Sequence, residues 1–118
     1  MDKNKLNQLK IFFKEQYPHI RRMALPNEIN INSCCNELVK LATTLNQQIN
    51  DVINCCSRNS QTVLITLYVE ELTNKTCMER LGYGSSNYYK RIKPSAFVEF
   101  MERMQAQYPD TRDKILAN

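Results

Sequence analysis

The sequence predicts an all-α fold, a small helical bundle, and two observations carry this prediction. Two glycines and four prolines among 118 residues are too few for the closely spaced turns of an all-β protein. Apolar residues recur at intervals of three and four, which places them on one face of an α-helix. A chain of this length fits one domain with a single core. We expect N-terminal helices over residues 1–58, a helix-turn-helix unit over 60–104 and a tail over 105–118.

The first predicted helix spans residues 4–17 and ends at Pro18, because an interior proline removes a backbone donor and clashes with the preceding turn. Its apolar stripe consists of Leu6, Leu9, Phe12, Phe13 and Tyr17. The basic stretch 19–23 is predicted to be a turn or a second short helix, followed by a loop at Pro26-Asn27. The only histidine, His19, has no partner carboxylate nearby in sequence, so we expect a surface residue rather than a catalytic base.

A long helix is predicted over residues 31–56, where apolar side chains alternate at spacings of four and three. The stripe is Ile31, Cys35, Leu38, Ala42, Leu45, Ile49, Val52 and Cys56, widened by Cys34, Leu41 and Ile53. A homodimer seam through residues 31–56 and the spine of a single-chain bundle both fit this pattern. The width of the stripe favours the spine, since a two-stranded seam is narrower.

Two further helices are predicted before the first glycine. Arg58-Asn59-Ser60 interrupts the long stripe, and Ser60 is the expected cap of a helix through Val63, Leu64, Leu67 and Tyr68. Thr73 is the expected cap of the next helix, and its stripe continues through Met78 and Leu81. Gly82 is expected to end that helix, because glycine accepts the left-handed backbone that a helix terminus needs.

The segment after Gly82 predicts a second short helix with an exposed polar face. Ser85 or Ser86 would cap it, and Tyr88 and Ile92, four residues apart, would face the core. The side chains left outside are Ser86, Asn87, Tyr89, Lys90, Arg91 and Lys93. This is the layout of a DNA-binding helix-turn-helix, whose second helix enters the major groove. Helix pairs joined by a glycine turn also occur in proteins that bind no nucleic acid.

Charge favours the DNA-binding interpretation. Residues 82–98 contain no acidic residue, whereas a merely solvated helix face usually mixes both signs. Residues 1–25 hold six Lys or Arg against two acids, residues 26–84 four against six, and residues 85–118 six against four. With a net charge of +4, this distribution suits a core flanked by two surfaces that approach phosphates.

A last helix is predicted after Lys93-Pro94, where the proline should end or kink the preceding one. Pro94 suits the first turn of a new helix. Its stripe would be Phe97, Phe100 or Met101, and Met104. Tyr108-Pro109-Asp110 should end it, leaving a loose tail or one short turn.

The five cysteines predict reduced, mostly buried thiols rather than a metal site or disulfides. They occur as Cys34-Cys35, Cys55-Cys56 and Cys77, without a Cys-x-x-Cys spacing. The sequence shows no signal-peptide pattern, no membrane span, no phosphate loop and no catalytic cluster. We therefore expect a cytoplasmic, non-enzymatic protein without cofactors.

The segment Leu81–Lys93, with Ala96-Phe97-Val98-Glu99-Phe100 after it, resembles the C-terminal part of the ArpU family. These are small phage-associated regulators of late-gene transcription in Gram-positive bacteria, related in style to RinA-type activators and to region 4 of sigma factors. Residues 61–70 look like the helix that precedes their helix-turn-helix. The resemblance covers about residues 60–104, and Gly84 stands where such sequences usually carry a serine cap, which moves the expected cap to Ser85.

The resemblance implies a sequence-specific regulator that binds double-stranded DNA through residues 85–91. Asn87, Lys90 and Arg91 are the expected base readers, with Ser86, Tyr89 and Lys93 on phosphates. Two alternatives stay open. A DNA-packaging protein similar to small terminase subunits would use residues 31–56 to oligomerise, and a helical adaptor would act on RNA polymerase.

Overall fold

The computed structural model describes residues 3–24 and 37–116, and these contain helices and no strand. The all-α prediction is confirmed. A first helical run consists of α1 (Lys3–Ile11), the π-helical segment η1 (Phe12–Gln16) and α2 (Tyr17–Ala24). It is followed by α3 (Glu37–Cys55), α4 (Arg58–Leu64) with η4 (Ile65–Val69), and α5 (Asn74–Leu81). The chain ends with α6 (Ser85–Asn87), η5 (Tyr88–Ile92), α7 (Lys93–Gln107) and α8 (Pro109–Leu116).

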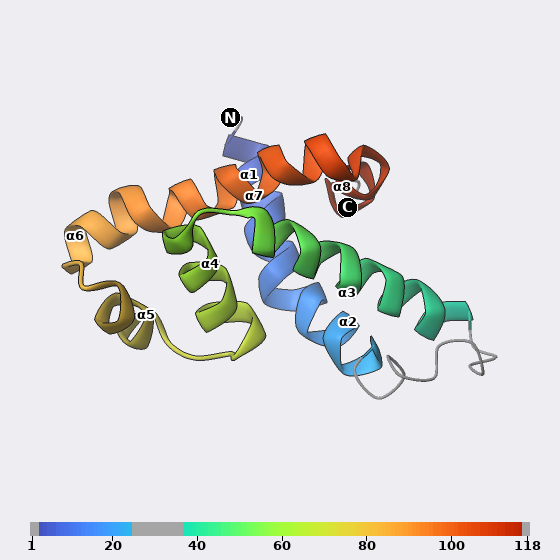
Figure 1. Ribbon diagram of the computed structural model, residues 1–118, viewed down its shortest axis with the longest axis horizontal. Coiled ribbons are helices and arrows are strands. Elements are labelled where there is room, and N and C mark those ends of the chain that lie inside the picture. The colour runs from blue at the N-terminus through green and yellow to red at the C-terminus, as the bar shows by residue number, and fades with distance from the viewer. Residues whose placement is uncertain (1–2, 25–36, 117–118) are drawn as a thin grey trace.

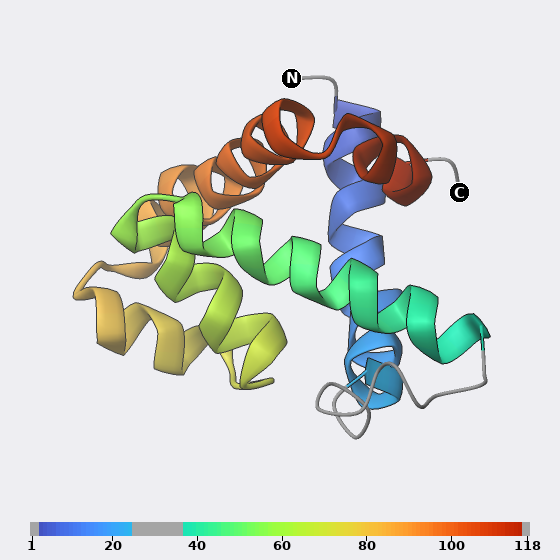
Figure 2. The same cartoon turned by 45° about the vertical axis from the view of Figure 1, so that its right-hand side comes forward.

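The arrangement places the two halves of the chain against each other. The run from α1 to α2 crosses α3, and α7 passes over both (Figures 1 and 2). The short helices α4, α5 and α6 gather at one end of the molecule (Figure 1). The core contains residues from nearly all of these elements, among them Phe13 of η1, Ile49 of α3, Leu64 of α4 and Phe100 of α7.

Pro18 was expected to end a helix, and Pro94 to end or kink one. Pro94 lies in the first turn of α7, as predicted, but neither proline breaks the helical backbone. The backbone stays helical through Pro18 and through Pro94, and a π-helical segment lies directly before each. In both places the N–H of the residue before the proline, Tyr17 or Lys93, bonds the carbonyl five residues back. The wider π turn makes room for the proline ring, which would collide with the carbonyl four residues back in a regular helix. The helix that begins at Ser85 therefore continues to Gln107.

The stripe of α3 faces the protein's own core. Ala42, Ile49, Val52, Ile53 and Cys56 are buried, while Leu41 is exposed. This is the geometry of the spine in a single-chain bundle. Residues 31–36 of the predicted long helix lie outside the described residues, as does the loop predicted at Pro26-Asn27.

Helix α4 begins three residues earlier than predicted. The cap is Ser57, in extended conformation, and Ser60 lies buried in the first turn. Both serines bond Glu99 of α7: the Ser57 N–H donates at 2.6 Å, its Oγ at 2.8 Å and the Ser60 Oγ at 2.6 Å. A carboxylate more than thirty residues away thus supplies the acceptor that a local cap would provide.

The C-terminal segment is more ordered than a tail. Helix α7 buries Phe97, Phe100, Met101 and Met104, as its stripe predicts, and ends at Tyr108. Residues 109–116 then form α8, which packs against α7 and α1. Thr111 and Ile115 of α8 are buried, which explains why this stretch is helical. No helix among the described residues is long and apolar enough to span a bilayer.

Candidate nucleic-acid interface

A three-residue turn joins α5 to the long helix that starts at Ser85. Thr73 caps α5 as predicted, its Oγ1 accepting the Thr76 N–H at 3.2 Å. Gly82 ends α5 with φ +78°, the left-handed conformation that favours glycine. The predicted serine cap of the second helix is wrong: Gly84 is the cap residue, and Ser85 opens the first turn. The chain therefore reverses within residues 82–84.

Tyr88 anchors the second helix to α5. Its ring is buried, and its hydroxyl donates to the Asn74 Oδ1 at 2.8 Å. Burial is the main reason why the pKa of Tyr88 is raised, and a hydrogen bond with Cys77 raises it further. Ile92, one turn later, also packs against the core, as predicted. The anchor determines which side chains of this helix face solvent.

Of the residues 85–91, only Tyr88 is buried. The exposed side chains, which we call the 85–91 segment, are Ser85, Ser86, Asn87, Tyr89, Lys90 and Arg91. Tyr89 is 48% exposed and packs edge-on against Tyr88, with ring centres 5.0 Å apart. The structure thus places six of the seven predicted site residues on about two consecutive helical turns, all of them exposed.

Lys93 is the exception among the predicted outward residues. Its side chain is partly buried and donates to the Asn74 Oδ1 at 3.1 Å, so it turns back towards α5. Its Nζ also lies 5.6 Å from the centre of the Tyr89 ring, a cation–π distance. Lys93 follows Tyr88 by five residues, and five residues of this widened helix return nearly to the buried side.

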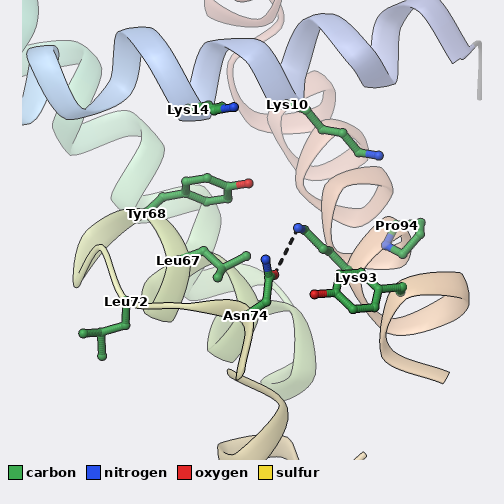
Figure 3. A pocket seen from close by; sticks show the side chains of 9 residues that line it. Lys10, Lys14, Leu67, Tyr68, Leu72, Asn74, Lys93 and Pro94 are labelled. Atoms are coloured by element: carbon green, nitrogen blue, oxygen red, sulfur yellow. Dashed lines mark hydrogen bonds between the residues drawn. The ribbon is translucent and has the colours of Figure 1, made fainter. Parts of the chain in front are cut away.

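Lys93 lines a groove that was not predicted from the sequence. The groove has a volume of about 540 Å³, and its lining includes Lys10, Lys14, Asn74 and Lys93 (Figure 3). Lys10 and Lys14 come from α1 and η1, 83 and 79 residues before Lys93 in the sequence. Their i,i+4 spacing and the basic character of residues 1–25 were the only sequence signals for them.

Other basic residues near this end of the molecule hold the fold together. Arg21 donates to the carbonyl oxygen of Val69 at 2.5 Å, and Arg22 lies 3.5 Å from the Glu71 carboxylate. Both contacts fix the connection that leads into α5. Arg80 of α5 pairs with Glu70 and donates to Thr66. Arg22 and Arg80 thus differ from Lys90 and Arg91, which no carboxylate neutralises among the ion pairs of the described residues.

The predictions for histidine and cysteine have mixed outcomes. His19 is exposed, as predicted. Cys56 and Cys77 are buried free thiols and Cys55 is exposed, while Cys34 and Cys35 lie outside the described residues. Burial raises the pKa of Cys56 to about 12, so that this thiol stays protonated at neutral pH. Within residues 3–24 and 37–116, no group of His, Cys, Asp and Glu side chains is placed to hold a metal ion.

Comparison with family models, with curated protein sequences and with solved structures finds no match to this chain.

Proposed function

We propose that the protein is a sequence-specific DNA-binding transcriptional regulator, of the kind that controls late genes of a phage or another mobile element. The DNA-binding element would be the helix pair of α5 and the helix that starts at Ser85. In this proposal the second helix lies in the major groove of double-stranded DNA.

One observation carries the proposal. The buried Tyr88 turns the 85–91 segment outwards, and the sequence from Gly82 to Val98 contains no acidic residue that would repel phosphates. Lys90 and Arg91 supply the charge, and Asn87 supplies an amide of the type that pairs with adenine. Arg91 can donate two bonds to guanine, which makes it the strongest base reader in the segment.

The remaining side chains would position the protein on the backbone. Ser85 and Ser86 lie in the first helical turn, where hydroxyls and backbone N–H groups point towards an approaching anion. Tyr89 adds a phenolic hydroxyl one turn later. The sequence predicts that Lys93 contacts a phosphate. Because its side chain turns towards Asn74, it would meet a phosphate only in the groove of the protein that these two residues line.

The packaging alternative has less support. It relied on residues 31–56 as an oligomerisation segment, and the buried positions of that segment within α3 face the protein's own core. Residues 60–104 resemble ArpU regulators, which are related in style to region 4 of sigma factors. We therefore keep RNA polymerase as a partner in this proposal.

Fluorescence anisotropy tests the proposal with DNA that flanks the protein's own gene, a scrambled fragment of equal length, and several salt concentrations. We expect binding that prefers the flanking DNA by at least about 10³-fold and weakens steeply with salt. Equal, weak binding to both fragments would contradict sequence-specific regulation. Binding to neither, together with retention of RNA polymerase in a pull-down, would favour the adaptor.

A further inference from the structure

We propose that the groove between α1, α5 and the start of α7 is a phosphate-binding site, which we call the lysine groove. Its cations are Lys10, Lys14 and Lys93. Where the phosphate belongs to nucleic acid, this inference rests on the proposed function, and the N-terminal helix then shares in DNA binding. The same chemistry would take a free phosphate if the protein bound no DNA.

The lining of the lysine groove is strongly unbalanced in charge. Three lysines contribute to it and no acidic side chain does, among the described residues. The other lining residues are Leu67, Tyr68, Leu72, Asn74, Tyr89 and Pro94. A volume of about 540 Å³ is larger than a phosphate group needs and leaves room for the adjoining sugars of a backbone. Three cations that line one groove without a counter-charge are an arrangement that a bound anion stabilises.

Two of these lysines, Lys10 and Lys93, are close enough for their charges to repel each other. The Lys10 Nζ lies 5.8 Å from the centre of the Phe97 ring, one turn along α7 from Lys93. Burial lowers the pKa of Lys93, and the charge of Lys10 lowers it further. An anion between these two ammonium groups would remove the repulsion, so the groove is organised for negative charge before a ligand arrives.

Neutral donors complete the site. The Asn74 Oδ1 accepts bonds from Tyr88 and Lys93, which directs the amide nitrogen towards the helix of Lys10 and Lys14 (Figure 3). The hydroxyl of Tyr68 points into the same space (Figure 3). Burial raises the pKa of Tyr68 to about 12, so this hydroxyl keeps its proton and can donate to a phosphate oxygen at neutral pH.

The position of the lysine groove explains how one ligand could contact both the groove and the 85–91 segment. Tyr89 belongs to the 85–91 segment and also lines the groove. Lys10 and Lys14 are four residues apart on a continuous helical run, so they project from one face of it. A nucleic-acid backbone beside the 85–91 segment would therefore meet the charge of the N-terminal helix next.

Salt dependence of DNA binding tests the inference with a double variant, Lys10→Gln with Lys14→Gln. The matched control is Lys5→Gln with Lys40→Gln, which removes the same charge from α1 and α3 outside the groove. In a plot of log affinity against log salt, each lost phosphate contact reduces the slope by about 0.9. We expect a reduction of about 2 for the groove variant, little change for the control, and recovery with Lys10→Arg and Lys14→Arg. Circular dichroism checks that each variant is folded.

A second arm separates this inference from the proposed function. Amide resonances of the wild-type protein are followed by NMR as inorganic phosphate replaces chloride at constant ionic strength. If no DNA binds, but phosphate shifts the resonances of Lys10, Asn74 and Lys93, the groove is a site for free phosphate and the proposed function fails. If DNA binds with equal slopes in the groove variant and its control, the lysine groove is not a phosphate site. If the protein binds no DNA and phosphate shifts no resonance of the groove, the proposed phosphate site is overturned as well.

Discussion

Arg91 is the side chain that best distinguishes base reading from backbone binding. It is exposed on η5, beside Lys90, and its planar guanidinium can donate two parallel bonds to guanine. We expect Arg91→Ala to weaken binding to the preferred site by about 1–3 kcal/mol and to relax its specificity. Anisotropy with the preferred and the scrambled DNA measures both effects. The control is Arg103→Ala, an exposed arginine about three turns further along the same helix. An equal loss on all sequences would make Arg91 a backbone contact instead.

Glu99 determines part of the acid sensitivity of the fold. Burial alone would raise the pKa of Glu99, but hydrogen bonds from Ser60 and Ser57 outweigh it and leave the pKa below its ordinary value. Because the unfolded chain then binds this proton more readily, the carboxylate stabilises the fold above about pH 4.3, the ordinary pKa of glutamate. That contribution is lost as the pH falls through the lower pKa of the folded state.

We therefore expect Glu99→Gln to reduce the free energy of unfolding at pH 7 by about 1–2 kcal/mol, since Ser60 and Ser57 lose a charged acceptor. The difference from the wild type should shrink when urea unfolding is repeated at a pH below the lowered pKa of folded Glu99, where the wild-type carboxyl is protonated. Glu102→Gln, an exposed glutamate on the same helix, is the control. A difference of equal size at both pH values would contradict this account.

At the scale of elements, the two glycines of the 82–84 turn have opposite roles. Gly82 has φ +78°, a conformation that strains any other residue, whereas Gly84 has φ −73° at the position of a helix cap. An added Cβ would meet nothing within 4 Å at either glycine. Steric clashes should therefore not decide the effect of a substitution at either position.

We expect the same change to have opposite signs at these two positions. Gly82→Ser should lower the free energy of unfolding by about 1 kcal/mol, because serine must adopt the left-handed conformation. Gly84→Ser should raise it by a few tenths of a kcal/mol, because serine can accept a bond from the free N–H groups of the first turn. Urea unfolding of both variants measures the difference. Equal effects would show that the turn can change its conformation.

For the whole molecule, Phe13 links the two halves of the chain. Its ring lies 5.0 Å from the centres of both Tyr68 and Phe100 and 6.1 Å from that of Phe97. Phe13→Ala should cost about 3–5 kcal/mol, a large part of the 5–15 kcal/mol typical of a domain. Ile11→Ala, at a side chain 52% exposed on the same helical run, should have a small effect.

Unfolding of the Phe13→Ala variant shows whether the halves are coupled. We expect far-UV and tyrosine signals to change in one transition, because the mutation removes packing shared by η1, η4 and α7. Amide exchange in residues 85–104 should accelerate as much as exchange in α1. Protection that persists in residues 85–104 would indicate that the C-terminal helices fold on their own.

The sequence alone determined the features that depend on neighbours within a few turns of helix. Stripes at spacings of three and four predicted the buried faces of α3 and α7, because helical geometry makes residues three and four apart share a face. Thr73 and Gly82 marked the two ends of α5 through their own backbone and hydroxyl chemistry. The burial of Tyr88 and the exposure of Asn87, Lys90 and Arg91 follow from the same periodicity.

Only the tertiary structure decided what depends on contacts between distant segments. Pro18 and Pro94 sit within continuous helical backbone, where a π turn makes room for each ring and the neighbours Tyr17 and Phe97 pack in the core. Ser57 caps α4 with the help of Glu99, and Lys93 turns inwards to Asn74. The meeting of Lys10, Lys14 and Lys93 in one groove required the crossing of α1 and α7, which no local pattern encodes. Local spacing fixes which face a side chain occupies, whereas the crossing of helices fixes which faces meet.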